Sequence, residues 1–81
     1  MRLYLSAHVL RSYQSASPAI QKAFNKQAAL LLGNIRHPSL HAKKYDEAEG
    51  VWQARVNRDW RFYFSIKDDL YYLHDIMPHP K

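Results

Sequence analysis

Residues 51–66 read VWQARVNRDWRFYFSI, two runs of alternating apolar and polar residues joined by a short polar turn. A period of two is typical of strands with one buried face, so the stretch predicts a β-hairpin. With residues 57–59 as the connection, one face holds the pairs Val56–Trp60, Ala54–Phe62 and Trp52–Phe64, and the other holds Arg55–Arg61 and Gln53–Tyr63. The first face is core and the second is cationic.

The opposed arginines give the cationic face a functional interpretation. Like charges directly opposite each other destabilise a sheet by up to about 1 kcal/mol. A bound anion such as a phosphate would relieve the repulsion between Arg55 and Arg61, because a guanidinium fork binds two phosphate oxygens. The alternative is an ordinary solvated face.

Composition limits the class of protein. The 81 residues predict a single domain over residues 1–81 with a modest core, and the net charge of +5 favours an anionic partner such as nucleic acid, an acidic protein or a membrane surface. The chain has no cysteine, which excludes disulfides and thiolate zinc sites. No apolar run approaches the roughly 18 residues of a membrane span, so we expect a soluble, cytoplasmic protein with no membrane partner.

Two helices are predicted before the hairpin. Ser6 can cap a first helix through about Ser15, with Val9, Leu10 and Tyr13 on its apolar side. Ser17-Pro18 is a stronger start, because serine suits the N-cap and proline the first helical position. This second helix ends at residues 33–34, and its apolar stripe contains Ile20, Phe24, Gln27/Ala28 and Leu31.

Strand signals surround these helices. Residues 2–5 alternate briefly, residues 43–45 fit a short strand entry, and a turn at Asp68-Asp69 folds residues 70–76 back on the hairpin. The predicted fold class is α+β, a small antiparallel sheet with an N-terminal α-hairpin packed on one face, in the order β-α-α-β-β-β. The other face is left open.

Five short motifs then show a family resemblance. They are GNIRHPSL (residues 33–40), KKY (43–45), GVWQARV (50–56), DWRFYF (59–64) and LHDIMPH (73–79). In order and spacing they resemble the RelE/ParE superfamily of toxins from type II toxin–antitoxin systems. The resemblance implies that a RelE-like member cuts mRNA, usually on the ribosome, and inhibits translation. It also implies a cognate antitoxin that holds the toxin inactive in a hetero-oligomer.

The resemblance implies roles for several residues. Arg55 and the pair Trp60-Arg61 match positions that place RNA and stabilise the scissile phosphate, and His79 matches the general acid. Lys43 falls near the position of a basic or histidine base, and Asp59 matches an acidic turn residue. We therefore expect Arg61, His79 and Arg55 to be catalytic, and RNA or phosphate to be bound by Lys43, Lys44, Arg58, Asp59 and His74.

The implied chemistry needs neither metal nor cofactor. The RNA 2′-OH attacks the adjacent phosphate while a base removes its proton, cations stabilise the added charge, and an acid protonates the leaving 5′ oxygen. Arginine suits the second task and histidine the third.

The chain departs from the family pattern in three places. Gln53 stands where some relatives have a second lysine, Met77 replaces a glycine, and Pro80-Lys81 stand where many members have a terminal aromatic residue. These departures predict weaker catalysis and weaker stacking on the RNA bases than in members that keep the pattern. Two alternatives therefore stay open, a ParE-like inhibitor of DNA gyrase and a catalytically decayed antitoxin-binding module. An acid at His79 is needed only by the ribonuclease.

Other side chains have competing interpretations. A two-residue turn at Asp68-Asp69 pairs His74 with Tyr63 on the cationic face, whereas a slip of one residue sends His74 to the core. His37 and His41 are four apart, but Pro38 prevents a shared helical face, so we expect them to satisfy loop backbone groups and not to bind metal. Tyr71 and Tyr72 are expected to divide between core and surface.

Overall fold

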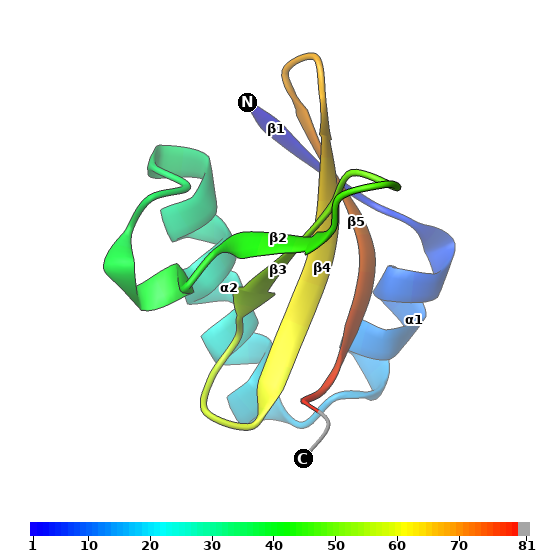
Figure 1. Ribbon diagram of the computed structural model, residues 1–81. Helices are drawn as coiled ribbons and strands as arrows, with labels where there is room; N and C mark the ends of the chain where they lie inside the picture. The colour runs from blue at the N-terminus through cyan, green and yellow to red at the C-terminus, as the bar shows by residue number, and fades with distance from the viewer. Residues whose placement is uncertain (80–81) are drawn as a thin grey trace.

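The computed structural model describes residues 1–79 and contains two helices, a short 3-10 turn and five strands (Figure 1). In chain order these are β1 (Arg2–Leu5), α1 (Ala7–Ser15), α2 (Pro18–Gly33), η1 (Pro38–Leu40), β2 (Lys43–Asp46), β3 (Val51–Arg55), β4 (Trp60–Lys67) and β5 (Leu70–Pro78). Both helices lie on one face of the sheet, behind it in Figure 1. No helix within the described residues is long and apolar enough to cross a bilayer.

The sheet has the strand order β1-β5-β4-β3-β2. The pairs β2/β3, β3/β4 and β4/β5 are antiparallel, which confirms the predicted meander. Two features differ from the prediction. Residues 43–46 form a complete edge strand, and β1 pairs in parallel with β5, so the sheet is mixed. Alternation along residues 2–5 indicates a strand but carries no information about its partner, which only the crossover through the helices determines.

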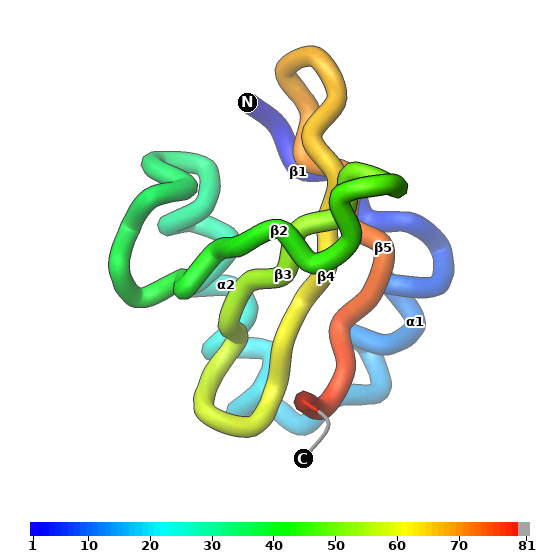
Figure 2. The backbone as a smooth tube through the Cα atoms, in the orientation of Figure 1, coloured from blue at the N-terminus to red at the C-terminus, as the bar shows by residue number. Residues whose placement is uncertain are grey.

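Figure 2 shows where the chain brings distant segments together. The start of β1 lies beside the turn between β4 and β5, where the Arg2 N–H donates to the Asp69 carbonyl at 2.9 Å. The end of β5 lies beside the turn between β3 and β4. The last described residues are therefore held against the β3–β4 hairpin.

The hairpin has the predicted register. Arg55 pairs with Arg61 and Ala54 pairs with Phe62. The Asn57 side-chain oxygen closes the turn, because it accepts hydrogen bonds from the backbone N–H groups of Asp59 and Trp60, both at 2.9 Å. Register is fixed here because a slip of one residue would carry the arginines into the core.

The core lies between the helices and the covered face of the sheet. Its fully buried side chains are Val9, Leu31, Leu40, Ala54, Phe62, Phe64 and Leu73. The Phe24 ring of α2 meets the Phe62 ring edge-on, with centroids 5.5 Å apart. Both predicted N-caps are present, since the hydroxyls of Ser6 and Ser17 accept hydrogen bonds from the first turns of α1 and α2.

Two expectations about side-chain burial have different outcomes. Leu10 is 45% exposed, so its assignment to the apolar side of α1 is wrong. It follows Val9 by about 100° around the helix, and it is Val9 that is fully buried, with Tyr13 packed against the core beside it. Tyr71 is buried while Tyr72 is half-buried and stacks on Tyr4 with centroids 4.9 Å apart, which confirms the predicted division.

The position of His74 corrects the predicted pairing. The turn at Asp68-Asp69 has two residues, as expected, but the register shifts between Tyr63 and Phe64, so that Tyr63 pairs with Asp75. His74 is the extra residue of a β-bulge, and its Nε2 lies 2.7 Å from the Ser65 hydroxyl. Turn length alone did not reveal the bulge, because a bulge changes the register without changing the turn.

Candidate active site

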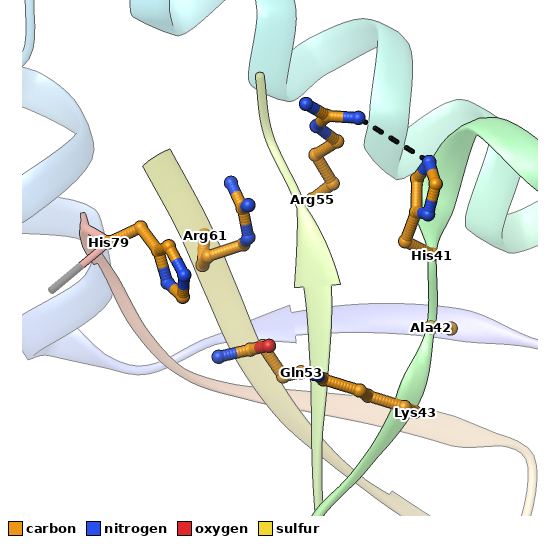
Figure 3. Close-up of a pocket in the computed structure, with 7 residues that line it drawn as sticks. All are labelled: His41, Ala42, Lys43, Gln53, Arg55, Arg61 and His79. Carbon is orange, nitrogen blue, oxygen red and sulfur yellow. Dashed lines mark hydrogen bonds between the residues drawn. The ribbon is translucent and has the colours of Figure 1, made fainter. Parts of the chain in front are cut away.

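A pocket of about 410 Å³ opens on the uncovered face of the sheet. It lies where β3 and β4 meet the segment before β2 and the end of β5 (Figure 3). Its lining residues are His41, Ala42, Lys43, Gln53, Arg55, Arg61 and His79. The structure thus brings together all three expected catalytic residues and one expected phosphate-binding residue, Lys43.

The floor of the pocket is neutral and fixed. Gln53 and Tyr63 are buried, although they lie on the face that the helices leave open. The Gln53 amide donates to the Tyr63 hydroxyl at 3.0 Å, and the Tyr45 ring of β2 covers Tyr63 at 4.9 Å between centroids. Gln53, at a position where some relatives have a lysine, therefore lies in the floor and is hydrogen-bonded to Tyr63. The positive charge of the pocket comes from the residues of its walls.

The two arginines share a carbonyl of the hairpin turn. The Asn57 carbonyl accepts from Arg55 Nε at 3.3 Å and from Arg61 Nη1 at 2.8 Å. Arg61 Nη1 also lies within 3.2 Å of the Arg58 carbonyl and 3.0 Å of the Trp60 carbonyl. These carbonyl dipoles offset part of the repulsion between the guanidinium groups, a task that we expected a bound anion to perform.

Both guanidinium groups keep donors for a ligand. Within residues 1–79, the hydrogen bonds found engage Nε and Nη1 of Arg55 and Nη1 of Arg61. No hydrogen bond within this part of the chain engages Arg55 Nη2 or the Nε and Nη2 groups of Arg61. An arginine has five N–H donors in a planar fork, so these groups match the oxygens of a phosphate.

A histidine stands on each side of the arginine pair. His41 Nε2 lies 3.4 Å from Arg55 Nη1, the contact drawn as a dashed line in Figure 3. His79 lies on the other side, beside Arg61. The His79 backbone N–H donates to the Asp59 carbonyl at 2.7 Å, which fastens the end of β5 to the hairpin turn. The pocket therefore places an imidazole on each side of two cations.

His41 is the pocket residue that the sequence patterns did not reveal. We expected both loop histidines to satisfy backbone groups, and His37 does so, since its Nδ1 accepts from the Ser39 N–H at 3.2 Å. His41 has left-handed backbone angles (φ 47) at the end of η1, and its side chain faces Arg55 instead. The nearest signal in the sequence was Lys43, two residues along, which matched a base position.

A buried glutamine of α2 holds this loop in place. Gln27 Nε2 donates to the Ser39 carbonyl at 3.1 Å and to the Arg55 carbonyl at 2.9 Å, and Gln27 Oε1 accepts from the Ser39 hydroxyl at 3.1 Å. These bonds join α2, η1 and the end of β3. Gln27 was predicted to lie on the buried stripe, and its hydrogen bonds place the loop of His41 against the strand of Arg55.

Four expected phosphate-binding residues lie outside the pocket. Lys44 Nζ lies 5.2 Å from the centre of the Trp52 ring, a cation–π position. The Arg58 side chain is 90% exposed, with the Asp59 carboxylate at 3.9 Å, and His74 contacts Ser65. Lys44 alternates with Lys43 along β2, Arg58 and Asp59 lie in the turn between β3 and β4, and the bulge displaces His74, so nearness along the sequence did not bring these groups to the pocket. The departure at Pro80-Lys81 lies outside the described residues.

The donor set of the pocket suits an anion. Two imidazoles, an ammonium and two guanidinium groups line it. Among residues 1–79, no group of three or more His, Cys, Asp or Glu side chains could hold a metal ion. Fold and pocket together define a small basic α+β protein with a cationic pocket on the uncovered face of its sheet.

Solved structures connect this fold to toxins. No protein-family model and no curated protein matches the chain. The YoeB/ParE toxin from Agrobacterium tumefaciens has a TM-score of 0.80 at 13% identity, covering 99% of this chain and 100% of that chain. The archaeal RelE–RelB complex from Pyrococcus horikoshii OT3 contains a chain with a TM-score of 0.79 at 18% identity, covering 95% and 92%.

A third structure, YafQ from E. coli strain BL21(DE3), has a TM-score of 0.76 at 15% identity, covering 95% of this chain and 91% of that chain. At these identities the likeness establishes the fold. The chain has the fold of the RelE/ParE toxins, which confirms the fold that the resemblance of its motifs implied.

Proposed function

We propose that this protein is the toxin of a toxin–antitoxin pair and that it cleaves mRNA in the cytoplasm, on the ribosome, and so inhibits translation. The observation that carries the proposal is the arrangement of Arg55 and Arg61 between His41 and His79 in one pocket. The likeness in fold to three structures, two of them a toxin and a RelE–RelB complex by name, supports it.

The scissile phosphate would lie on the two guanidinium groups. Their unengaged N–H donors bind the non-bridging oxygens, and their charge stabilises the pentacoordinate phosphorane more than the ground-state diester. A bond forms between the 2′ oxygen and phosphorus, and the bond from phosphorus to the 5′ oxygen breaks. The products are a 2′,3′-cyclic phosphate and a free 5′-OH.

The two histidines would handle the protons. His41 Nε2 accepts the proton of the 2′-OH, after the phosphate has drawn the Arg55 guanidinium away from the imidazole. His79, held beside Arg61 by the backbone bond to Asp59, protonates the 5′ oxygen. Lys43 lies in the same pocket and adds a positive charge to the phosphate-binding wall.

An antitoxin would cover this surface in the cell. The archaeal RelE–RelB complex, the E. coli RelBE toxin–antitoxin complex and the YoeB–YefM heterotetramer from Staphylococcus aureus all contain chains of this fold. Because this chain has a net charge of +5, the antitoxin is acidic and complementary charge speeds their association. The expected assembly is a hetero-oligomer.

The test is cleavage of mRNA in a translating extract, with primer extension to locate the ends. Arg61→Ala removes transition-state stabilisation and is expected to cost about 2 to 4 kcal/mol. His79→Ala removes the proton donor and is expected to slow cleavage by about two to four powers of ten. Lys22→Ala, on the exposed side of α2, is the matched control for lost charge. Products should carry 2′,3′-cyclic phosphates, and a 2′-deoxy nucleotide at the cut should prevent cleavage.

Other results would assign another function. If wild type leaves mRNA intact and blocks supercoiling by DNA gyrase, the protein is a gyrase inhibitor. If it does neither and still binds an antitoxin, it is a decayed binding module. Cleavage that persists in both variants would remove Arg61 and His79 from the site.

A further inference from the structure

A second groove adjoins the active-site pocket. It has a volume of about 390 Å³ and lies between α2 and the turn that joins β3 to β4. Arg55 and His41 line both hollows, so the two adjoin at these side chains. The groove adds two cations of its own, Lys26 from α2 and Arg58 from the turn.

We propose that this groove is a second nucleotide subsite, which holds the RNA backbone next to the scissile phosphate. The inference rests on the proposed function, because it extends the strand that the first pocket binds. A single-stranded RNA carries one negative charge per nucleotide, and a continuous row of cations is how a protein follows such a backbone. Arg55 would mark the boundary between the two subsites.

The charge of the groove is available to a ligand. No carboxylate is among the groove-lining residues of the described chain. Arg58 is 3.9 Å from the Asp59 carboxylate, but the two side chains are 90% and 70% exposed. An ion pair so exposed contributes little, so it does not hold Arg58 away from a phosphate.

The remaining lining points to backbone binding without base readout. Ala23 and Val56 give the groove a small apolar wall, against which a ribose or a base face can pack. The side chains of Gln27 and Ser39 are already bonded to each other and to backbone, and Asn57 Oδ1 accepts from the backbone N–H groups of Asp59 and Trp60. Base identity is read by free donors and acceptors. The subsite is therefore expected to add affinity for RNA with little preference for sequence.

The test compares RNA lengths and charge-matched variants. The probes are 2′-O-methyl oligonucleotides of two and of six nucleotides, which cannot be cleaved through the 2′-OH, with dissociation constants measured by fluorescence anisotropy at several salt concentrations. The double variant Lys26→Ala/Arg58→Ala removes the groove cations. The control, Lys22→Ala/Lys67→Ala, removes the same charge from exposed positions outside both hollows.

The groove variant is expected to bind the hexanucleotide about tenfold more weakly than wild type, and its slope of log affinity against log salt should fall by about 0.7 for each phosphate that is no longer bound. Its affinity for the dinucleotide, which fills only the first pocket, should stay that of the control. Equal losses in the two double variants would overturn the subsite, as would an equal loss for both probe lengths or no binding of RNA by wild type.

A different result would overturn the proposed reaction without overturning the subsite. A wild-type protein that binds the hexanucleotide through the groove but leaves mRNA intact in a translating extract would overturn the endoribonuclease and keep the RNA subsite. If wild type and the groove variant cleave mRNA equally well and bind the hexanucleotide with equal affinity, the endoribonuclease proposal stands and the subsite is overturned.

Discussion

The pair Arg55–Arg61 shows how a turn can make an unfavourable contact tolerable. Directly opposite cations should repel, yet the Asn57 carbonyl lies between them and accepts from both. A carbonyl carries only a partial charge, so it offsets the repulsion without neutralising either guanidinium. The pair stays cationic, and in the proposed reaction the scissile phosphate completes its hydrogen bonding.

His41 is the residue whose role in the reaction needs the most direct test. We expect His41→Asn to slow mRNA cleavage by about two to four powers of ten, because it removes the proton acceptor. Asparagine tolerates the left-handed backbone that His41 adopts, so the loop should keep its shape. The measurement is the rate of cleavage in the translating extract.

The matched control for His41 is His8→Asn on α1. The His8 side chain is 59% exposed and contacts Asp75, outside the pocket. It should leave the rate unchanged. A His41→Asn protein that cleaves at the wild-type rate would transfer the base role to another group of the pocket, and Lys43→Met would then be the next variant to measure.

At the level of elements, α2 contributes to the site without lining its first pocket. Gln27 is 4% exposed and bonds to η1 and to the last residue of β3. A helix that packs on the far face of the sheet thereby sets the spacing between the His41 loop and Arg55. Gln27 is a positioning residue, since it acts through the backbone of its neighbours.

Gln27→Leu tests this link. Leucine keeps the helix and nearly the same volume, but the partly buried carbonyls of Ser39 and Arg55 lose their donor, so we expect the free energy of unfolding to fall by about 1 to 3 kcal/mol. The measurement is urea denaturation. Gln14→Leu, on the exposed side of α1, is the control and should change stability by less than about 0.5 kcal/mol.

A second readout separates positioning from bulk stability. Under conditions where the Gln27→Leu protein is fully folded, its maximal rate of cleavage should still fall, because His41 and Arg55 are no longer held at a fixed separation. Gln27→Glu keeps the acceptor for the Ser39 hydroxyl but not the donor to the two carbonyls, and it should not restore the rate. A folded Gln27→Leu protein with the wild-type rate would show that the glutamine only stabilises the fold.

At the scale of the whole molecule, the net positive charge and the uncovered face of the sheet lead us to expect a binding partner, without which the chain should be toxic. Expression of the chain alone is expected to stop growth of the host, because mRNA cleavage inhibits translation. The double variant Arg61→Ala/His79→Ala should be tolerated at the same soluble level. The measurement is growth after induction, with the level of each protein followed by immunoblot, and Lys22→Ala as the control that remains harmful.

Co-expression of a short acidic protein encoded beside this chain should restore growth. Harmless expression of the soluble wild-type chain would instead favour the decayed binding module. Harm that the double variant retains in full would favour an action without catalysis, such as inhibition of gyrase.

The amino-acid sequence by itself determined the local structure. Alternation and the polar turn at residues 57–59 together fixed the hairpin and its register, so that Arg55 faces Arg61, since the turn sets which residues pair and a slip of one residue would expose the apolar face. Ser6, Ser17 and Pro18 marked the starts of the helices, because capping chemistry is local.

Only the tertiary structure decided which distant groups meet. The bulge at His74, the parallel pairing of β1 with β5, and the approach of His41 to Arg55 all depend on packing between segments far apart in the chain. Local patterns carry no information about such partners. The pocket is made of loop and strand-end residues that α2 and the end of β5 hold in place, and its geometry therefore exists only in the folded chain.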